Sequence, residues 1–369
     1  MKKLFIVMLG VSAVVACTKS SVSYEPAGEI ALAPVNEINK TKTTVTDGVF
    51  PADRIMGVYA YYKADCQDGT DVKLFKDAST YLDNVQFKQN GTYWAGWKDG
   101  KAYPYYWPKN GSLVFAAYSP LTDAAGKSAV ESHTFKADGN AVVSDIFKND
   151  TFTQSRLTDK TVDLMWSPVT ASSHTSKSNH VAMTFYHAMS WITFKAKFTQ
   201  PADMAMTTEP VITIKSLTLD NVATKGKFET HVAEITWTPV VDANAVQQPI
   251  VVFRAEGDQQ PLALTAKSVD VENNANGTLV IPQDIKDDIV ATITYDQHVP
   301  GTAKVEQKAV LHLNQCKVGN QPLKTWMNAK HYIYDINFTF GTDDQIYIAP
   351  SVKEWEKEYV GTDGAVDHK

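Results

Sequence analysis

The stretch AYPYYWPKNGSLVFAAYSP (residues 102–120) joins an aromatic half to a strand-like half. In the second half the apolar residues alternate as in a β-strand: Leu113, Phe115 and Ala117 fall on one face, and Val114, Ala116 and Tyr118 on the other. Pro108 and a Lys-Asn-Gly turn stand between the halves. We therefore expect 105–107 and 113–118 to form a β-hairpin.

The aromatic half admits two main interpretations. It contains Tyr103, Tyr105, Tyr106 and Trp107. In a hairpin of a β-sandwich one face is core, so about half of these side chains would be packing residues. A surface platform for a sugar is the alternative, and a contact with a partner protein is a third use.

Outward from this stretch, short runs rich in β-branched and aromatic residues fill the chain, separated by Gly, Pro, Asn and Asp. They lie at 29–35, 55–62, 85–97, 112–120 and 161–166, and then at 180–198, 211–222, 250–255, 277–283, 289–295, 308–314, 331–340 and 345–350. Within 180–198 the alternation shifts phase near His187. No stretch keeps a helical period over 15 residues. The sequence predicts an all-β protein of two sandwich domains.

The domain boundary is expected in the Ser/Thr-rich stretch 167–179, which has no aromatic residue. This gives an N-terminal sandwich at 29–172 and a C-terminal sandwich with a terminal strand and tail at 173–369. The length of the chain, 369 residues, also favours two domains.

The N-terminus has the pattern of an export signal. Met1-Lys2-Lys3 precedes an apolar run from Leu4 to Val15, which is too short to span a membrane. The run ends in Val14-Val15-Ala16-Cys17, the pattern of a lipobox. We expect residues 1–16 to be a lipoprotein signal peptide, Cys17 to be lipidated, and 17–28 to be a polar tether. Cleavage as an ordinary signal peptide is the alternative.

Composition and motifs favour a non-enzymatic protein. The net charge of −6 argues against binding of nucleic acid. No catalytic motif, metal-ligand spacing or cofactor-binding loop is present, and the acidic turn 65–71 lacks EF-hand spacing. His187, inside an apolar strand, suits a hydrogen-bonded packing role. Cys66 and Cys316 lie far apart in sequence and are expected to be free thiols. A hydrolase on a β scaffold is the enzymatic alternative.

Seven segments resemble the fimbrillin family in the same order along the chain. They are FPADRIMGVYAYY (50–62), YPYYWPKNGSLVFAAYSP (103–120), TVDLMWSP (161–168), HVAMTFYHAMSWITFKAKF (180–198), TKGKFE (224–229), GTLVIPQ (277–283) and IYIAPSVKEW (346–355). With the strand at 29–35 they span residues 29 to 355. The resemblance implies a type V pilus subunit of Gram-negative anaerobes, acting as stalk, tip or anchor.

The resemblance also implies a fold, a route and partners. The fold would be two transthyretin-like Greek-key sandwiches. The protein would reach the outer membrane through the lipid on Cys17, and then the fimbrium at the cell surface. There an arginine- or lysine-specific protease would remove the first strand, and a strand of the next subunit would replace it. Other fimbrial subunits are the expected partners, with adhesion to host or bacterial surfaces as the result. A glycan-binding surface lipoprotein is the alternative function.

The family pattern suggests candidate residues for this strand exchange. The released first strand would present Ile30, Leu32 and Val35. The polar loop after it carries Lys40 and Lys42, where the family favours an arginine; the first arginine of this chain is Arg54, at the start of a predicted strand. We expect cleavage at Lys40 or Lys42, with Arg54 as the arginine candidate and an uncleaved anchor as the alternative.

The donor strand is expected near the C-terminus. Ile346 and Ile348 alternate with polar or small neighbours, and Val352 and Trp355 add further apolar anchors. We expect part of residues 346–359 to insert into a neighbouring subunit. The alternative is that 346–348 pairs within its own domain.

Overall fold

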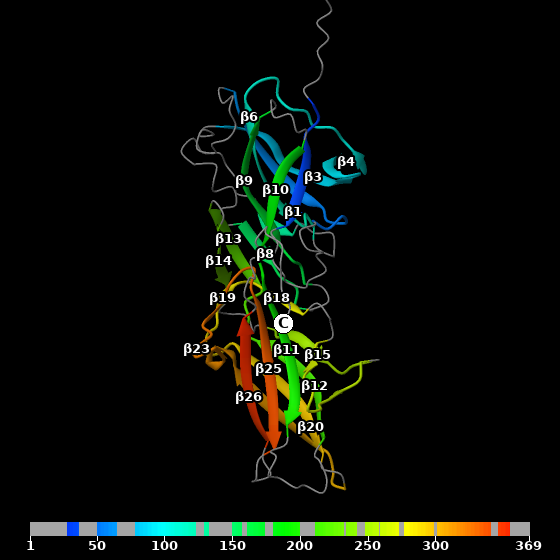
Figure 1. Ribbon diagram of the computed structural model, residues 1–369, viewed down its shortest axis with the longest axis vertical. Coiled ribbons are helices and arrows are strands. Elements are labelled where there is room, and N and C mark those ends of the chain that lie inside the picture. Colours follow the sequence, from blue (N-terminus) through cyan, green and yellow to red (C-terminus); the bar gives the residue numbers. More distant parts are fainter. Residues whose placement is uncertain are drawn as a thin grey trace, which may run out of the picture.

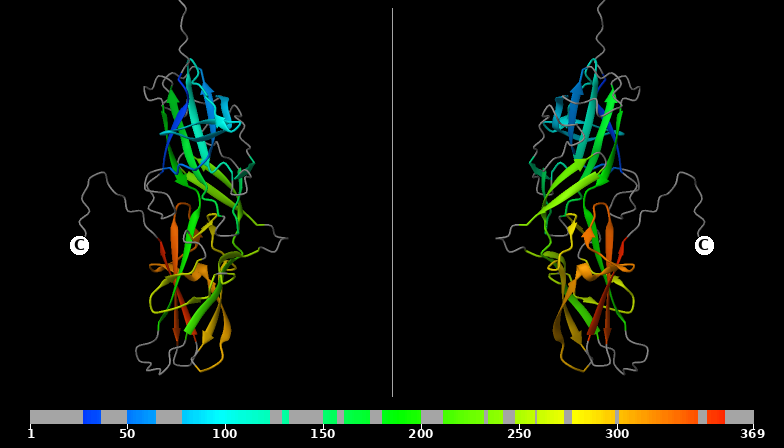
Figure 2. Two further views of the ribbon diagram at one scale, coloured as in Figure 1. Left: turned by 90° about the vertical axis from the view of Figure 1, so that its right-hand side faces the viewer. Right: turned by 90° about the vertical axis from the view of Figure 1, so that its left-hand side faces the viewer.

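The computed structural model describes residues 28–36, 50–64, 78–122, 129–132, 150–156, 161–173, 180–199, 211–231, 234–241, 248–257, 259–272, 277–298, 301–340 and 346–354. These residues form an elongated, all-β molecule with two units along its long axis (Figures 1 and 2). The all-β prediction is thereby confirmed. The transthyretin-like topology of each half stays a prediction.

The first unit is built around a sheet that closes on itself. Its strand order is β1-β10-β9-β6-β2-β3-β4-β5, and β1 also pairs with β4. Its strands are β1 (Ala31–Asn36), β2 (Met56–Lys63), β3 (Ser79–Asn90), β4 (Tyr93–Lys98), β5 (Lys101–Ala102), β6 (Ser112–Ser119), β9 (Met165–Ser173) and β10 (His180–His187). Closure makes β1 the strand that seals the barrel between β10 and β4.

A second sheet covers one outer side of this barrel. Its order is β14-β13-β8-β7, with β7 (Val130–Ser132), β8 (Asp150–Thr153), β13 (Lys225–His231) and β14 (Glu234–Val240). Between the layers lie large side chains such as Tyr59, Tyr118, Trp166 and Phe228, all buried. The barrel strands β2 and β6 therefore have core on both faces.

The alternation expected for 113–118 is confirmed by this arrangement. Leu113, Phe115 and Ala117 lie in the core inside the barrel, whereas Val114, Ala116 and Tyr118 lie in the core between the layers. The expected hairpin with 105–107 does not form, because β6 pairs with β2 and β9 instead. A strand buried on both faces belongs in the middle of a sheet, and residues 103–107 carry Pro104 beside Tyr105.

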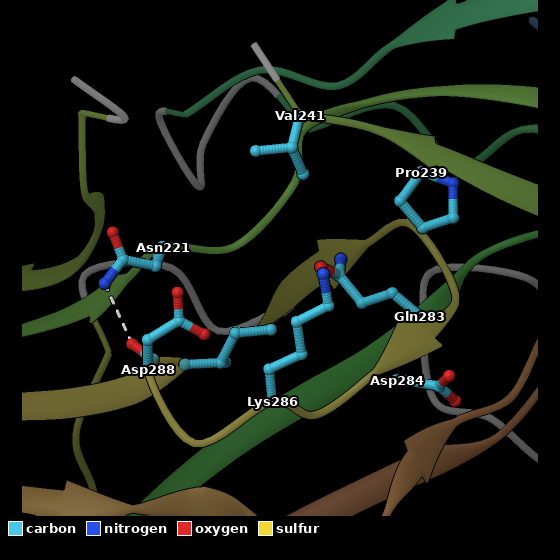
Figure 3. A pocket seen from close by; sticks show the side chains of 8 residues that line it. Asn221, Pro239, Val241, Gln283, Asp284, Lys286 and Asp288 are labelled. Atoms are coloured by element: carbon cyan, nitrogen blue, oxygen red, sulfur yellow. Dashed lines mark hydrogen bonds between the residues drawn. The ribbon is translucent and has the colours of Figure 1, made fainter. Parts of the chain in front are cut away.

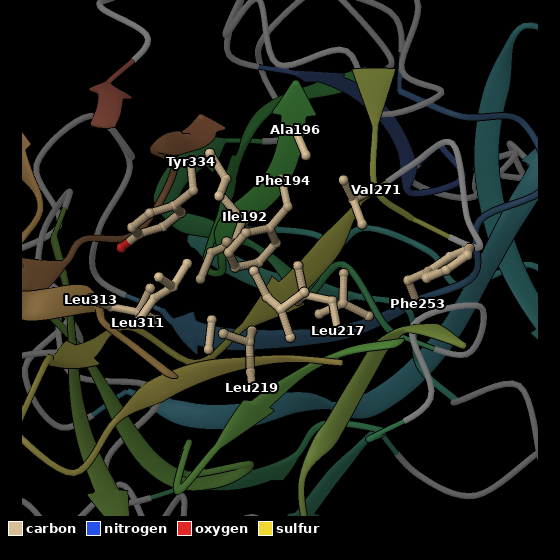
Figure 4. Close-up of a cluster of buried hydrophobic side chains, with 14 of the residues drawn as sticks. Ile192, Phe194, Ala196, Leu217, Leu219, Phe253, Val271, Leu311, Leu313 and Tyr334 are labelled. Carbon is tan, nitrogen blue, oxygen red and sulfur yellow. The ribbon is translucent and has the colours of Figure 1, made fainter. Parts of the chain in front are cut away.

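The second unit is a sandwich of two five-stranded sheets. One has the order β17-β11-β25-β26 with β18 beside β11, and the other has β15-β12-β20-β21 with β16 beside β12. The bounds are β11 (Ser190–Thr199), β12 (Val211–Asp220), β15 (Ile250–Arg254), β16 (Leu262–Ala263), β17 (Val269–Asp270), β18 (Thr278–Val280), β20 (Val290–His298), β21 (Val305–His312), β25 (His331–Phe340) and β26 (Ile346–Glu354). Ile192 and Phe194 of β11 meet Leu217 and Leu219 of β12 in its core (Figure 4).

Short elements complete the second unit. β19 (Gln283–Asp284) pairs with β24 (Thr325–Trp326), and β22 (Lys317–Val318) pairs with β23 (Gln321–Pro322). A 3-10 turn spans Leu313–Gln315. No helix in the described part of the chain is long and apolar enough to cross a membrane.

The chain passes between the units at the phase shift near His187. β10 ends at His187 in the barrel, and β11 begins at Ser190 in the second sandwich. The sheet of the first unit thus continues past the boundary expected at residues 172 and 173. Residues 165–173 form a strand of that sheet in spite of their Ser/Thr-rich composition, because they pair with the edge of β6 that β2 leaves unoccupied. The strands β13 and β14 also return to cover the barrel.

Candidate functional site

The first strand, β1, lies between two strands that are far apart in sequence. It runs parallel to β10, with Leu32 opposite Val181 and Pro34 opposite Met183, and antiparallel to β4, with Leu32 opposite Trp94 (Figure 1). Parallel pairing with β10 requires the long connection that the intervening residues provide. We call β10, β4 and residues 103–107, which hold β1 in place, the β1 site.

The inner face of β1 completes the barrel core. Ile30 and Leu32 are fully buried, as expected for the first strand, and pack in one cluster with Trp94 and Phe185. Phe50, where the described chain resumes, joins them: its ring lies 4.6 Å from that of Phe185 and 5.7 Å, edge-on, from that of Trp94. The side chain of Val35 lies outside the described residues, although its backbone belongs to β1.

The aromatic stretch 103–107 forms the third part of the site. The Ile30 amide donates to the Tyr105 carbonyl at 2.7 Å, and the Trp107 amide donates to the Gly28 carbonyl at 3.1 Å. Gly96 of β4 permits this approach, since a Cβ there would lie 2.3 Å from the Tyr105 ring. Trp107 is buried in the barrel core, whereas Tyr103 and Tyr106 are 42% and 46% exposed. The expectation that about half of the aromatic residues pack is confirmed.

The outer face of β1 lies beneath a pair of rings from its two neighbours. Tyr93 of β4 and His180 of β10 stack with ring centres 5.1 Å apart and planes inclined by 22°. His180 is opposite Ala31 in the β1–β10 register. The two rings can meet across β1 because Ala31 and Ala33 are small. Sequence reasoning missed this pair, since nothing in the chain order connects β4 with β10.

Arg54 is held in an ion-pair cluster, two residues before β2. Its guanidinium donates to the Asp163 carbonyl at 3.0 Å and lies 3.7 Å from the Asp163 carboxylate. The same carboxylate is 2.9 Å from Nδ1 of His187, which confirms the hydrogen-bonded packing role expected of that histidine. The Ile55 carbonyl accepts hydrogen bonds from Leu121 and Ser119. Protease access after Arg54 would require this cluster to open.

Asp163 is ionised in spite of its burial. Desolvation alone would raise the pKa of its carboxyl, but the charge and hydrogen bond of His187 and the charge of Arg54 together hold the pKa below its usual range. The cluster joins the start of β2, the segment before β9 and the end of β10. It therefore ties together the part of the barrel from which the chain crosses to the second unit.

The C-terminal strand β26 pairs within its own sandwich. This is the arrangement that the alternative to the donor role predicts. It pairs antiparallel with β25 over its whole length, including Ile348 opposite Phe338 and Pro350 opposite Ile336. β26 is an edge strand, paired on one side in its sheet. Ile348 is half-buried against the core, and the backbone of Ile346 and Val352 belongs to the strand. Edge strands are the positions where proline is tolerated, which accounts for a strand that continues past Pro350.

Several expected site residues lie outside the described residues: Cys17, Lys40, Lys42, Cys66, the acidic turn 65–71 and Trp355. Cys316 is a free, buried thiol whose pKa burial raises to about 11. Among the described residues no cluster of His, Cys, Asp or Glu could hold a metal ion.

A small pocket lies where β14 meets β19, at the junction of the two units (Figure 3). Asn221, Lys286 and Asp288 line it, and the Asn221 amide donates to the Asp288 carbonyl at 2.8 Å. Gln283 also lines the pocket. Its side-chain amide donates to the Ala223 and Ile281 carbonyls and accepts a hydrogen bond from the Ala223 amide. The polar groups of this pocket hold loops together and bring no reactive set of side chains into one place.

The described residues define an all-β protein in which β1, the first described strand, closes a barrel between β10 and β4. The chain belongs to the fimbrillin-like family, whose model matches residues 43–355. This is a family of fimbrial proteins and not a family of enzymes.

Solved structures similar to this chain are fimbrial or putative cell adhesion proteins. A putative cell adhesion protein from Bacteroides uniformis is 15% identical, with 89% of this chain and 98% of that chain covered and a TM-score of 0.44. One from Parabacteroides distasonis is 13% identical, with 89% and 99% covered and a TM-score of 0.43. The fimbrial anchor protein Mfa2 from Porphyromonas gingivalis is 12% identical, with 89% and 97% covered and a TM-score of 0.31. No curated protein matches the chain.

Proposed function

We propose that this protein is a subunit of a type V fimbrium and that it assembles by exchange of β1 for a strand of a neighbouring subunit. The observation that carries the proposal is the position of β1. It seals an otherwise continuous barrel, and the chain connects it to the other described strands of that barrel through the segment 37–49. A cut in that segment would leave β1 held by hydrogen bonds and burial alone.

Loss of β1 would create a strong binding site for another strand. The facing edges of β10 and β4 would lose their partner, and the sites of Ile30 and Leu32 would become exposed. An incoming strand restores the backbone hydrogen bonds and buries apolar side chains, each contributing roughly 1.5–3 kcal/mol when fully buried. An unpaired sheet edge that would be an aggregation hazard in a monomer becomes the joint of a polymer.

The proposal includes the route to the surface. Cys17 carries the lipid that delivers the subunit to the outer membrane, and cleavage at Lys40 or Lys42 releases the lipidated segment together with β1. Arg54 is the weaker candidate because its side chain is paired with Asp163. Subunits of the same or a minor type are the partners, and an uncleaved copy would serve as the anchor.

Lipidation has a direct test. In cells given radiolabelled palmitate, the parent protein should take up label and a Cys17→Ser variant should not. Equal labelling of the two proteins would contradict the lipoprotein route, and a Cys316→Ser variant provides a control for other thiols.

The donor strand in this proposal is β26, tested by truncation. A chain ending at Gln345 should form no SDS-resistant ladder on its own, since it offers a groove and no donor. Co-expressed with a tagged full-length chain, it should shorten that chain's ladder, because it can still accept a donor and end a polymer. The second result shows that the truncated chain folds. A normal ladder from the truncated chain alone would exclude β26 as the donor.

A further inference from the structure

The exposed part of the aromatic stretch is not used by the proposed assembly. Trp107 belongs to the barrel core, whereas Tyr106 is 46% exposed. Two tyrosines from other strands gather beside it, Tyr62 near the end of β2 and Tyr81 near the start of β3. We propose that this tyrosine cluster, made of Tyr62, Tyr81 and Tyr106, is a binding site for a neutral hexopyranose sugar of a surface glycan. The proposal does not depend on strand exchange.

The tyrosine cluster lies at the end of the barrel that faces away from the second unit. The chain leaves the barrel at His187, the last residue of β10. Because β1 runs parallel to β10, Glu29 and its bridge partner Tyr106 lie at the opposite end. Tyr62 is at that end too, since Leu113 opposite it lies at the start of β6, and β6 ends on the His187 side. The barrel occupies the upper end of the long axis in Figure 1, so a ligand there would not meet the second unit.

A β-bulge in β3 sets the position of Tyr81. Leu82 and Thr80 are opposite successive residues of β2, so Tyr81 between them is an extra residue in the ladder. Bulges re-aim a side chain and are frequent at the rims of barrels and beside functional sites. The Tyr81 hydroxyl donates to the Tyr106 carbonyl at 2.6 Å, and the Tyr81 ring centre lies 6.2 Å from that of Tyr62. The bulged residue thus connects the other two tyrosines.

Two of the hydroxyl groups are held by the protein while ring surface stays in water. The Tyr62 hydroxyl donates to the Asn110 side chain at 3.2 Å, and that of Tyr81 donates to a backbone carbonyl. The Tyr81 residue is nevertheless 38% exposed. A ring whose hydroxyl is fixed loses little conformational entropy when a ligand packs on it. The tyrosine cluster is therefore an apolar surface prearranged for a ligand.

Two polar side chains lie beside the rings. Glu29 is opposite Tyr106 in an antiparallel bridge, and the backbone hydrogen bonds fall on the residues to either side of this pair. In a pair of this kind the two side chains lie close together. Asn110 accepts from Tyr62 through its side-chain oxygen, which leaves its amide group to donate. The surface thus combines ring faces with one carboxylate and one amide.

A pyranose sugar matches this combination of groups. One face of such a ring carries C–H bonds, which pack on the electron-rich face of an aromatic side chain. Its rim carries hydroxyl groups, which donate to a carboxylate such as that of Glu29 and accept from an amide such as that of Asn110. A carboxylate beside the rings also disfavours an acidic sugar, because two negative charges repel each other. The geometry therefore favours a neutral hexose over a sialic or uronic acid.

Tyr103 offers a matched control from the same stretch. It is 42% exposed, but the Lys98 ammonium lies 5.3 Å from its ring centre. Its ring contacts that of Tyr105, with centres 5.2 Å apart. In an extended segment residues 103 and 105 point to one side and residue 106 to the other. Removal of the Tyr103 ring therefore leaves the tyrosine cluster intact.

A glycan array measures the proposed binding. The uncut full-length chain, purified in detergent and labelled, is applied to neutral oligosaccharides ending in galactose, glucose or mannose and to sialylated ones. Separate fields of animal and of bacterial glycans distinguish the two sources of the same sugar. We expect binding to neutral oligosaccharides. Tyr81→Ala and Tyr106→Ala should each weaken it about ten-fold or more, the loss of one packed ring, and Glu29→Gln should also weaken it. Tyr103→Ala should bind as the parent does.

Folding is separated from binding by a second variant. Tyr81→Phe keeps the ring and should bind more tightly than Tyr81→Ala, and urea denaturation shows that each variant is folded. An array on which no neutral sugar is bound would overturn the proposal, as would equal binding by the parent and Tyr106→Ala proteins. Binding of a second copy of this chain through the same tyrosines, with no glycan bound, would also overturn it. None of these results bears on strand exchange, which the ladder experiment tests.

Discussion

At the scale of single residues, Leu32 connects the fold with the proposed assembly. Its side chain is fully buried inside the barrel, yet it belongs to a strand that the chain is proposed to release. Its contribution to stability is thus also a part of the barrier that keeps the monomer closed. The free energy of unfolding that is lost when Leu32 is substituted can be measured in the uncleaved monomer.

We predict that Leu32→Ala lowers the free energy of unfolding of the uncleaved monomer by about 2–5 kcal/mol, the range for large-to-small changes in a core. Urea denaturation followed by tryptophan fluorescence measures this loss. Ala33→Ser, on the opposite face of the same strand, is the control and should change stability little. Equal stabilities of the parent and the Leu32→Ala protein would mean that β1 does not fill the barrel.

Asp163 is the second residue with a measurable consequence. Asp163→Asn removes the negative charge that Arg54 and His187 share and keeps the backbone carbonyl to which Arg54 donates. We predict a loss of about 3–5 kcal/mol at pH 7, as for other buried pairs from which one charge is removed. Arg254→Gln, whose partner Glu256 is exposed, is the matched control and should cost less than about 1 kcal/mol.

The same cluster predicts a pH dependence. Because the folded state holds the pKa of Asp163 below its usual range, the unfolded chain binds the proton more readily. The stabilisation is therefore complete above the unfolded pKa of about 3.9 and is lost as the pH falls through the folded value. The difference in stability between the parent and Asp163→Asn proteins should shrink in acid. A difference that stays constant from pH 7 to pH 3 would contradict the assignment.

At the scale of elements, β1 and β26 are similar strands with different surroundings. β1 has neighbours on both sides, whereas β26 has one and lies at an edge. The uncut chain therefore holds β1 firmly and β26 less so. Cleavage before Phe50 changes this balance, because β1 then becomes a separate peptide that dilution can remove.

Cleavage at the two lysines has its own prediction. A chain with Lys40→Gln and Lys42→Gln should stay uncut on cells and form no ladder, because Arg54 is paired with Asp163 and the remaining candidate is protected. Immunoblots of cell-surface fractions show whether the protein has its uncut or its shortened length. Lys101→Gln, at an exposed position in β5, is the control and should be cut normally. Normal processing of the double variant would place the cut elsewhere.

Local pattern was sufficient for most strands and insufficient for their partners. The alternation in 113–118 predicted which side chains share a face, because a strand has a fixed period of two. It did not predict that both faces are core, nor that β6 pairs with β2 and β9 rather than with 105–107. Pairing depends on contacts between distant segments, and the turn signal at 108–111 gave no information about them.

At the scale of the whole molecule, the two ends of the exchange lie in different units. The β1 site belongs to the barrel, and β26 belongs to the second sandwich at the other end of the long axis (Figures 1 and 2). A donor at one end and an acceptor at the other form a head-to-tail contact. Repetition of such a contact without closure generates a fibre rather than a ring.

The sequence predicted the candidate site in part. The family pattern placed Ile30 and Leu32 in the first strand, where both are buried. The crossing between the units was expected in the stretch 167–179, whereas the chain crosses between His187 and Ser190. The Tyr93–His180 stack, the hold of residues 103–107 on β1 and the cluster around Asp163 were not expected. Each of these contacts joins segments that are far apart in sequence and meet only in the folded barrel. The spacing of residues within one segment therefore cannot predict them.

The central claim is that the assembled subunit has lost its first strand, and N-terminal sequencing of the protein sheared from the cell surface tests it most directly. The account predicts that the sequence begins at Thr41 or Thr43, directly after Lys40 or Lys42, so that Ile30 and Leu32 are absent. An assembled fimbrial subunit that still begins at Cys17, and so keeps β1 in its barrel, would contradict the account.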